Sequence, residues 1–231
     1  MQQGETEVGV RAIPEPPLEY KELVCGPAYT EHFEVVGRVM VDALDAEGMV
    51  SPRSDFLDVG CGCGRVARYL MATPLHSYAG FDRHPGMIRW CREHLAPRDR
   101  RFSFRHFDLR SVYESYDGYA GTVSATTFEF PYSDGTFDSV LIASVFTHMP
   151  LEEVRHYLAE LHRVVRAAGK VLLSVFFSES VTFAEGVNFF YRPSEFLAMC
   201  EEAGFSYRAR DDLAKVGYEH NWYVLTSTSL W

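Results

Sequence analysis

The sequence predicts an α/β protein whose sheet is mainly parallel and carries helices on both faces. Three observations predict this class. Short apolar segments typical of strands alternate with segments of helical periodicity between residues 55 and 203. Glycine or proline separates most of these segments. Residues 171–177 are almost continuously apolar, which is typical of a strand buried on both faces of a parallel sheet.

The elements follow one another in a simple order. Residues 1–17 are polar and rich in proline, which predicts a flexible or extended arm. Apolar residues at helical spacing predict one helix within residues 19–47. Strands are predicted at residues 55–59, 77–81, 102–107, 138–143, 171–177, 206–210 and 222–228. Helices are predicted at residues 65–71, 85–95, 151–165 and 194–203.

Length and composition exclude several classes of function. A chain of 231 residues fits one domain. A net charge of −10 argues against a general nucleic-acid binder, which needs a basic face. No apolar run approaches the roughly 20 residues of a membrane span, and residues 1–7 lack the features of a secretory signal. With five cysteines and no zinc-ligand spacing, we expect reduced thiols, no metal and a cytoplasmic protein.

The strongest motif follows the first predicted strand. Residues 56–65 read Phe-Leu-Asp-Val-Gly-Cys-Gly-Cys-Gly-Arg, with glycine at every second position of the turn. Glycine permits positive φ and lets the backbone approach a ligand closely. A dinucleotide fingerprint would place its third glycine at Arg65, and no Gly-Lys-Ser/Thr ending is present. The spacing therefore disfavours both common phosphate-binding loops.

Acidic residues end the next two strands. Asp82 follows the second predicted strand and Asp108 follows the third. In an open parallel sheet the ligand lies beyond the carboxyl ends of the strands. A carboxylate at that edge is a strong acceptor for ribose hydroxyl groups. Because NAD enzymes also carry an acid there, Asp82 indicates a nucleoside without choosing the cofactor.

The Asp-Val-Gly-Cys-Gly-x-Gly segment resembles motif I of the class I S-adenosylmethionine-dependent methyltransferases, and the resemblance covers about residues 56–205. It implies a doubly wound, Rossmann-like sheet of seven strands, mainly parallel, with an antiparallel last strand. It also implies S-adenosylmethionine as the cofactor. One departure is an Ala-Ala-Gly turn before the fifth strand, where the family commonly has Pro-Gly-Gly.

The resemblance also implies roles for single residues. The glycine turn would wrap the methionine and ribose parts of the cofactor, and Asp82 would bind the ribose. Met87 would pack on the adenine, although a core position explains it equally well. Asp108 would receive the adenine amino group and the next N–H a ring nitrogen, whereas a turn-capping role is the alternative. The expected cofactor-binding residues are Asp58, Gly60, Cys61, Gly62, Gly64, Asp82, Arg83, Met87, Asp108, Leu109 and Ser144.

The predicted activity is in-line transfer of a methyl group to oxygen or nitrogen of a small molecule. His148 follows the fourth strand and is the candidate base, with helix capping or packing as the alternative. We divide the chain into an arm and cap helix (residues 1–50) and a methyltransferase domain (residues 51–231). Insertions at about residues 113–131 and 178–193 are predicted to face the substrate, and a small β-hairpin is an equal interpretation of the second.

Two other functions stay open at this point. An NAD(P)-dependent reductase is disfavoured by the glycine spacing and by the lack of a Tyr-x-x-x-Lys pair beside the fourth strand. A non-catalytic module that binds S-adenosylmethionine would keep the pocket and lack access for an acceptor. We expect no nucleic-acid or membrane partner. The acceptor atom and the oligomeric state are not determined by the sequence.

Overall fold

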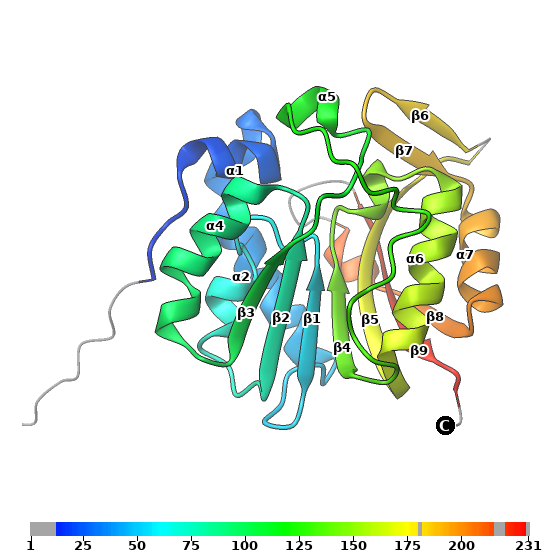
Figure 1. Cartoon of the computed structure of the whole chain (residues 1–231). Helices are drawn as coiled ribbons and strands as arrows, with labels where there is room; N and C mark the ends of the chain where they lie inside the picture. Colours follow the sequence, from blue (N-terminus) through cyan, green and yellow to red (C-terminus); the bar gives the residue numbers. More distant parts are fainter. Residues whose placement is uncertain (1–12, 180–181, 215–219, 230–231) are drawn as a thin grey trace, which may run out of the picture.

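The computed structural model describes residues 13–179, 182–214 and 220–229, and it confirms the predicted α/β class. The central strands lie in the order β3-β2-β1-β4-β5, all parallel, and continue through β9 to β8 (Figure 1). Strand β9 is antiparallel to both neighbours, as predicted for the last strand. The strands are β1 (Asp55–Val59), β2 (Ser77–Asp82), β3 (Phe102–His106), β4 (Phe137–Ile142), β5 (Val165–Phe177), β8 (Phe205–Ala209) and β9 (Asn221–Ser227).

Helices cover both faces of this sheet, because strand side chains alternate between two apolar clusters. Phe56 of β1 belongs to the cluster shared with α2, α3 and α4, and Leu57 belongs to the cluster shared with α6 and α7. Residues 171–175 of β5 are buried on both faces, as predicted. The covering helices are α2 (Phe33–Ala46), α3 (Ala67–Leu70), α4 (Pro85–His94), α6 (Leu151–Val164) and α7 (Pro193–Glu202).

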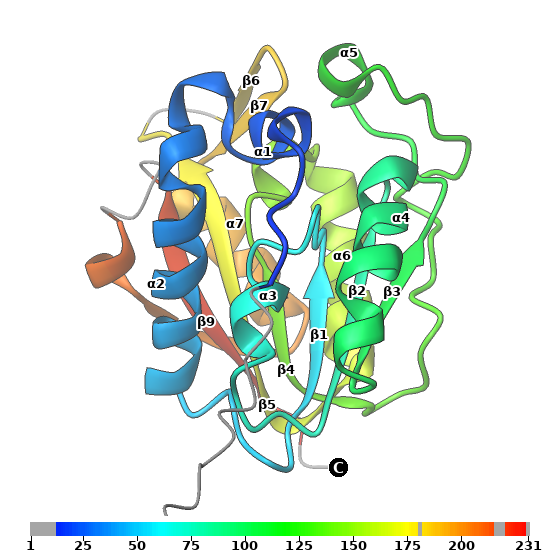
Figure 2. The same cartoon turned by 90° about the vertical axis from the view of Figure 1, so that its left-hand side faces the viewer.

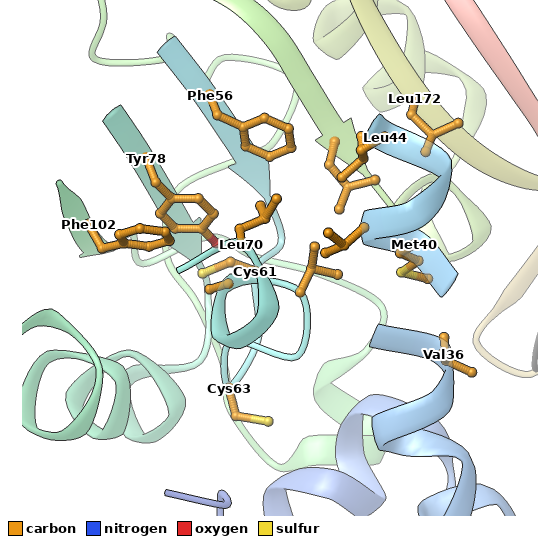
Figure 3. Close-up of a cluster of buried hydrophobic side chains, with 14 of the residues drawn as sticks. Val36, Met40, Leu44, Phe56, Cys61, Cys63, Leu70, Tyr78, Phe102 and Leu172 are labelled. Carbon is orange, nitrogen blue, oxygen red and sulfur yellow. The ribbon is translucent and has the colours of Figure 1, made fainter. Parts of the chain in front are cut away.

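One of these cores lies directly beneath the glycine turn. Figure 3 shows Phe56, Tyr78 and Phe102 projecting from three neighbouring strands. The rings of Tyr78 and Phe102 are stacked with centroids 4.7 Å apart. Although Tyr78 is buried, its hydroxyl donates to the Asp58 carboxylate at 2.7 Å, so its polar end is satisfied. The aromatic core thereby fixes an acidic group below the turn.

Two helix predictions were wrong in their extent. The single helix expected within residues 19–47 is divided into α1 (Leu18–Cys25), the 3-10 turn η1 (Pro27–His32) and α2. Gly26 has a φ of 77° and precedes a proline, and both features end α1. The helix expected from residue 65 begins only at Ala67, because Gly64 has a φ of 77° and the chain still turns there.

The second insertion forms the hairpin of β6 (Phe183–Glu185) and β7 (Asn188–Tyr191), and β7 pairs with the end of β5. This hairpin, α1 and α5 (Glu114–Asp117) lie at the same end of the sheet (Figure 2). The remaining short helical turns are η2 (Ala96–Arg98), η3 (Phe146–His148) and η4 (Asp211–Leu213). Within the described ranges, no helix is long and apolar enough to cross a membrane.

Candidate active site

A large hollow lies where β1, β2 and β4 end. It is open to solvent and, with the open space at its mouth included, measures about 1190 Å³. Most of the predicted site residues line it, namely Asp58, Gly60, Cys61, Gly62, Asp82, Arg83, Met87, Leu109, Ser144 and His148. Gly64 and Asp108 do not line it. We call this hollow the central cavity.

The glycine turn forms one wall of the central cavity. Gly60 has a φ of 74°, and a Cβ there would lie 2.3 Å from a methyl group of Val145. The N–H groups of Gly60 and Cys61 both donate to the carbonyl oxygen of Phe81, at 2.9 and 3.0 Å. These bonds attach the turn to the end of β2. The wall is therefore rigid backbone, and a side chain at Gly60 would not fit against the residues that follow β4.

Asp82 connects the glycine turn to the start of α4. One carboxylate oxygen accepts the Gly62 N–H at 2.8 Å and the other accepts the His84 N–H at 2.7 Å. An ionised carboxylate has about four acceptor positions, so about two remain for a ligand. Burial raises the pKa of Asp82, and the two N–H donors act against this shift. The arrangement fits the two adjacent hydroxyls of a ribose.

Asp58 is the acid of the cavity floor. Burial raises the pKa of Asp58 to about 7, against the opposing effects of the Tyr78 hydrogen bond and the positive charge of Arg65. The carboxyl is therefore close to its titration midpoint at neutral pH. A cation arriving beside it would favour the ionised form.

The Asp108 carboxylate does not line the cavity and is bound by the loop that follows β3. Its two oxygens accept the hydroxyls of Tyr119 and Thr122, each at 2.5 Å. The Leu109 N–H donates to the carbonyl of Phe107 at 2.8 Å. Asp108 thus stabilises the loop that follows β3, and its contact with the adenine amino group stays a prediction. Gly64 packs instead beneath the turn, where its Cβ position faces Leu95 and Cys91.

Arg83 is occupied by that same loop. It donates to the carbonyl oxygens of Leu109 and Tyr119, forms an ion pair with Asp117, and stacks over the Tyr119 ring. Its guanidinium lies at the cavity wall and holds the segment after β3 in place. A direct contact of Arg83 with the cofactor stays a prediction.

Ser144 carries strain at the end of β4. Its φ of 59° lies in the left-handed region, which is unusual for a residue other than glycine. Its N–H donates to the Ser174 hydroxyl at 2.8 Å, and its own hydroxyl is buried without a partner in the described structure. Strain and an unsatisfied polar group at a cavity wall both indicate a ligand site.

His148 lies in η3 beside the rim of the cavity. Its Nδ1 is 3.0 Å from the carbonyl oxygen of Val187, in the β6–β7 turn. Since a carbonyl only accepts, Nδ1 carries the proton and Nε2 is the acceptor of the neutral ring. Burial lowers the pKa of His148, which favours this neutral form. The hairpin therefore positions His148, whereas no described residue between 178 and 193 lines the cavity.

The sequence did not single out several cavity residues. Glu153 and Tyr157 of α6 lie four residues apart on one side of the helix, and both reach the cavity. Burial raises the pKa of Glu153 to about 7, and neighbouring Glu152 adds to the shift. Leu23, Val24 and Arg65 from other segments also line the cavity. Tyr113, Asp117 and Ala125 line it as well, and they belong to the first insertion, which was predicted to face the substrate.

Comparisons with known proteins define the class. Residues 57–173, half of the chain, match the family described as "Methyltransferase domain". The malonyl-[acyl-carrier protein] O-methyltransferase of Acetivibrio thermocellus is 28% identical over 148 residues, which is 59% of this chain and 50% of that protein. The chain therefore matches only about half the length of this curated relative.

Solved structures share the fold at lower identity. The Burkholderia thailandensis 1,6-didemethyltoxoflavin-N1-methyltransferase, with bound S-adenosylhomocysteine, superposes with a TM-score of 0.60 at 17% identity, covering 95% of this chain and 94% of that one. Magnesium protoporphyrin IX methyltransferase from Synechocystis PCC 6803, with bound S-adenosylmethionine, superposes with a TM-score of 0.61 at 15% identity, covering 94% of this chain and 88% of that chain.

The chain belongs to the methyltransferase-domain family, and it has the fold of class I S-adenosylmethionine-dependent methyltransferases. The cofactor of this class is S-adenosylmethionine, and the cavity fits it on three observations. Gly60 leaves a wall free of side chains, Asp82 has unused acceptor positions, and Ser144 presents an unsatisfied hydroxyl. Family membership sets aside the reductase interpretation.

Proposed function

We propose that this methyltransferase acts on a small molecule and methylates an oxygen or nitrogen atom. The observation that carries the proposal is one continuous cavity that includes both the glycine turn and His148. Leu23 and Val24 of α1 and Tyr113 of the first insertion form part of its wall. Tyr113 donates to the Leu23 carbonyl at 3.2 Å, which joins these two segments. A partly enclosed space of this kind suits a small acceptor better than a folded macromolecule.

The residues of the cavity divide into a cofactor part and an acceptor part. Asp82 would bind the ribose, the turn of Gly60 to Gly62 would follow the methionine arm, and Met87 and Leu109 would contact the adenine. Asp58 would face the ammonium group of the methionine arm. Ser144 would hold the boundary between the two parts, and Asp108 and Gly64 would support the loops from behind. The insertion at residues 113–131 would contribute to the acceptor part through Tyr113, Asp117 and Ala125.

The bound cofactor supplies an electrophilic methyl group on a sulfonium and a neutral thioether leaving group. In the transfer, a lone pair of the acceptor would form the new bond to the methyl carbon, and the electrons of the broken carbon–sulfur bond would stay on sulfur. The protein's main task is to hold the acceptor in line, and such orientation contributes roughly 7–11 kcal/mol. An acceptor that carries a proton must also lose it.

His148 is the group we assign to that proton. Its neutral ring presents Nε2 as a base, because Nδ1–H is held by the Val187 carbonyl. The proton lost by the acceptor would move to Nε2, and solvent at the cavity mouth would remove it. General base catalysis of this type adds about 10²–10⁴-fold to the rate.

A methyl-transfer assay tests the proposal. The purified chain is incubated with S-adenosylmethionine carrying a deuterated methyl group and with a fractionated small-molecule extract. We expect S-adenosylhomocysteine to form together with a small product that carries the deuterated methyl. Labelling of protein or nucleic acid, with no labelled small molecule, would contradict the assignment of the acceptor class.

A further inference from the structure

The central cavity contains one buried positive charge that the cofactor assignments above leave without a function. Arg65 follows the glycine turn, is 6% exposed and lines the cavity. Its only hydrogen bond in the described structure runs from Nη1 to the Cys25 sulfur, at 3.6 Å. A thiol sulfur is a weak acceptor, and a guanidinium carries five donors. Most of the hydrogen-bonding capacity of Arg65 is therefore unused.

The other buried arginines behave differently. Arg68 lies three residues further along and pairs with Glu34 at 2.5 Å. Arg210 pairs with Glu47 at 2.6 Å and also with Asp212. Among the described residues, no carboxylate forms an ion pair with Arg65. Because a buried charge without a partner is costly, this exception at a cavity wall indicates that an anion binds there.

The Asp58 carboxyl, which also lines the cavity, indicates which kind of anion Arg65 binds. The positive charge of Arg65 partly opposes the burial that raises the pKa of Asp58, although the two side chains form no ion pair. The Asp58 carboxylate accepts its hydrogen bond from Tyr78 and none from Arg65. Both residues line the cavity and flank the glycine turn on the two sides. An acid and a base in this arrangement match the ammonium and carboxylate of an α-amino acid.

We propose that Arg65 binds the α-carboxylate of the methionine arm of the cofactor, opposite the ammonium at Asp58. The inference rests on the proposed placement of the cofactor in the central cavity. A carboxylate of the acceptor is the other possible source of this chemistry, and the experiment separates the two. Arg65 forms charge-assisted hydrogen bonds there, and its planar fork suits a carboxylate.

The test compares two ligands that differ only in the amino-acid arm. S-adenosylhomocysteine carries the arm, and 5′-methylthioadenosine keeps the nucleoside and thioether without it. We expect Arg65→Gln to weaken the binding of S-adenosylhomocysteine by about 10- to 100-fold in calorimetry, as expected for loss of a hydrogen bond to a charged group. The affinity for 5′-methylthioadenosine should change less than about twofold. Arg65→Lys should recover part of the lost affinity, which keeps the test valid if the glutamine variant does not fold.

Arg68→Gln is the matched control, because Arg68 is equally buried on the same segment but lies outside the cavity. It should leave the ratio of the two affinities unchanged. If Arg65→Gln lowered the affinity for both ligands equally, Arg65 would have a structural role and the inference would fail. An unchanged affinity for S-adenosylhomocysteine with a raised KM for the acceptor would assign the carboxylate to the acceptor. If the wild-type chain binds neither ligand, the placement of the cofactor itself fails.

Discussion

The two carboxyl groups beside the glycine turn, those of Asp82 and Asp58, have different hydrogen-bond donors and are suited to different roles. Asp82 is held by two N–H donors and stays an acceptor for hydroxyls. Asp58 has only the Tyr78 hydroxyl as a donor in the described structure, and burial raises its pKa to about 7. The first residue is suited to permanent hydrogen bonding and the second to a response to a nearby cation.

The raised pKa of Asp58 makes a prediction about stability. Its ordinary value is 3.8 and its value in the folded chain is about 7, so the folded state binds this proton more tightly than the unfolded state. The stability contributed by this proton is present below about pH 4 and is lost as the pH rises toward 7. Asp58→Asn should therefore gain stability relative to wild type as the pH rises through this window, by about 1.4 kcal/mol per pH unit.

Urea unfolding at about pH 5 and pH 7 measures this difference. The asparagine side chain is neutral in both the folded and the unfolded chain, so the comparison isolates the titration of one group. A stability gap that stays constant between the two pH values would show that Asp58 titrates in the ordinary range.

The role of His148 as a base can be tested by substitution. His148→Gln should lower kcat by about 10²–10⁴-fold and leave the affinity for S-adenosylmethionine unchanged, because it removes a base and no cofactor contact. His76→Gln serves as the control, since the His76 side chain is 66% exposed and lies outside the cavity. Equal kcat in the His148 variant and the wild type would remove His148 from the chemistry.

Several residues that line the cavity could be placed from the sequence because they directly follow a strand. Asp82, Ser144, Gly60 and Gly62 are among them, since the ends of parallel strands meet at one edge. Arg65 and Glu153 could not be placed in this way, because their significance depends on which charges fail to find partners after folding. Asp108 follows its strand as expected, yet Tyr119 and Thr122 from the later loop compete for its carboxylate.

At the scale of elements, α1 and the segment after β3 form the roof of the cavity. The segment of residues 109–119 is held from below by Arg83, which contacts Leu109, Tyr119 and Asp117. It is held from the side by α1, through the Tyr113 hydroxyl and the Leu23 carbonyl. The roof is thus attached to the sheet edge and to α1 through polar contacts with few residues.

Loss of the Arg83 contacts should loosen this roof. Arg83→Gln is expected to increase amide hydrogen exchange across residues 109–119 and to raise the KM for S-adenosylmethionine several-fold. Arg155→Gln is the matched control, because it breaks an exposed ion pair with Glu202 at the surface of α6. Unchanged exchange in residues 109–119 of the Arg83 variant would mean that other contacts hold the roof.

Regular elements were predictable where periodicity and a terminating residue agreed. Helix α6 was found almost to its ends, because Pro150 begins it and its apolar stripe is regular. The helix expected within residues 19–47 failed at Gly26, since the apolar pattern continues across a break in the backbone. The hairpin of β6 and β7 confirms the hairpin interpretation of the second insertion, whereas its pairing with the end of β5 could not be predicted from local sequence.

For the whole molecule, the sheet separates two cores and brings the chemistry to one end. The aromatic core on the α2 side supports Asp58, whereas the core on the α6 side supports Glu153 and Tyr157. Loops from both sides meet over the carboxyl ends of β1, β2 and β4, where the central cavity lies.

Calorimetric titration with S-adenosylhomocysteine tests the central claim, that this cavity binds the adenosyl cofactor through Asp82. We expect one molecule to bind per chain with micromolar affinity, and Asp82→Ala to weaken it by about tenfold or more, which corresponds to about 1.4 kcal/mol or more. NADPH should give no binding heat. Full affinity in the Asp82 variant, or binding of NADPH in place of S-adenosylhomocysteine, would contradict the account.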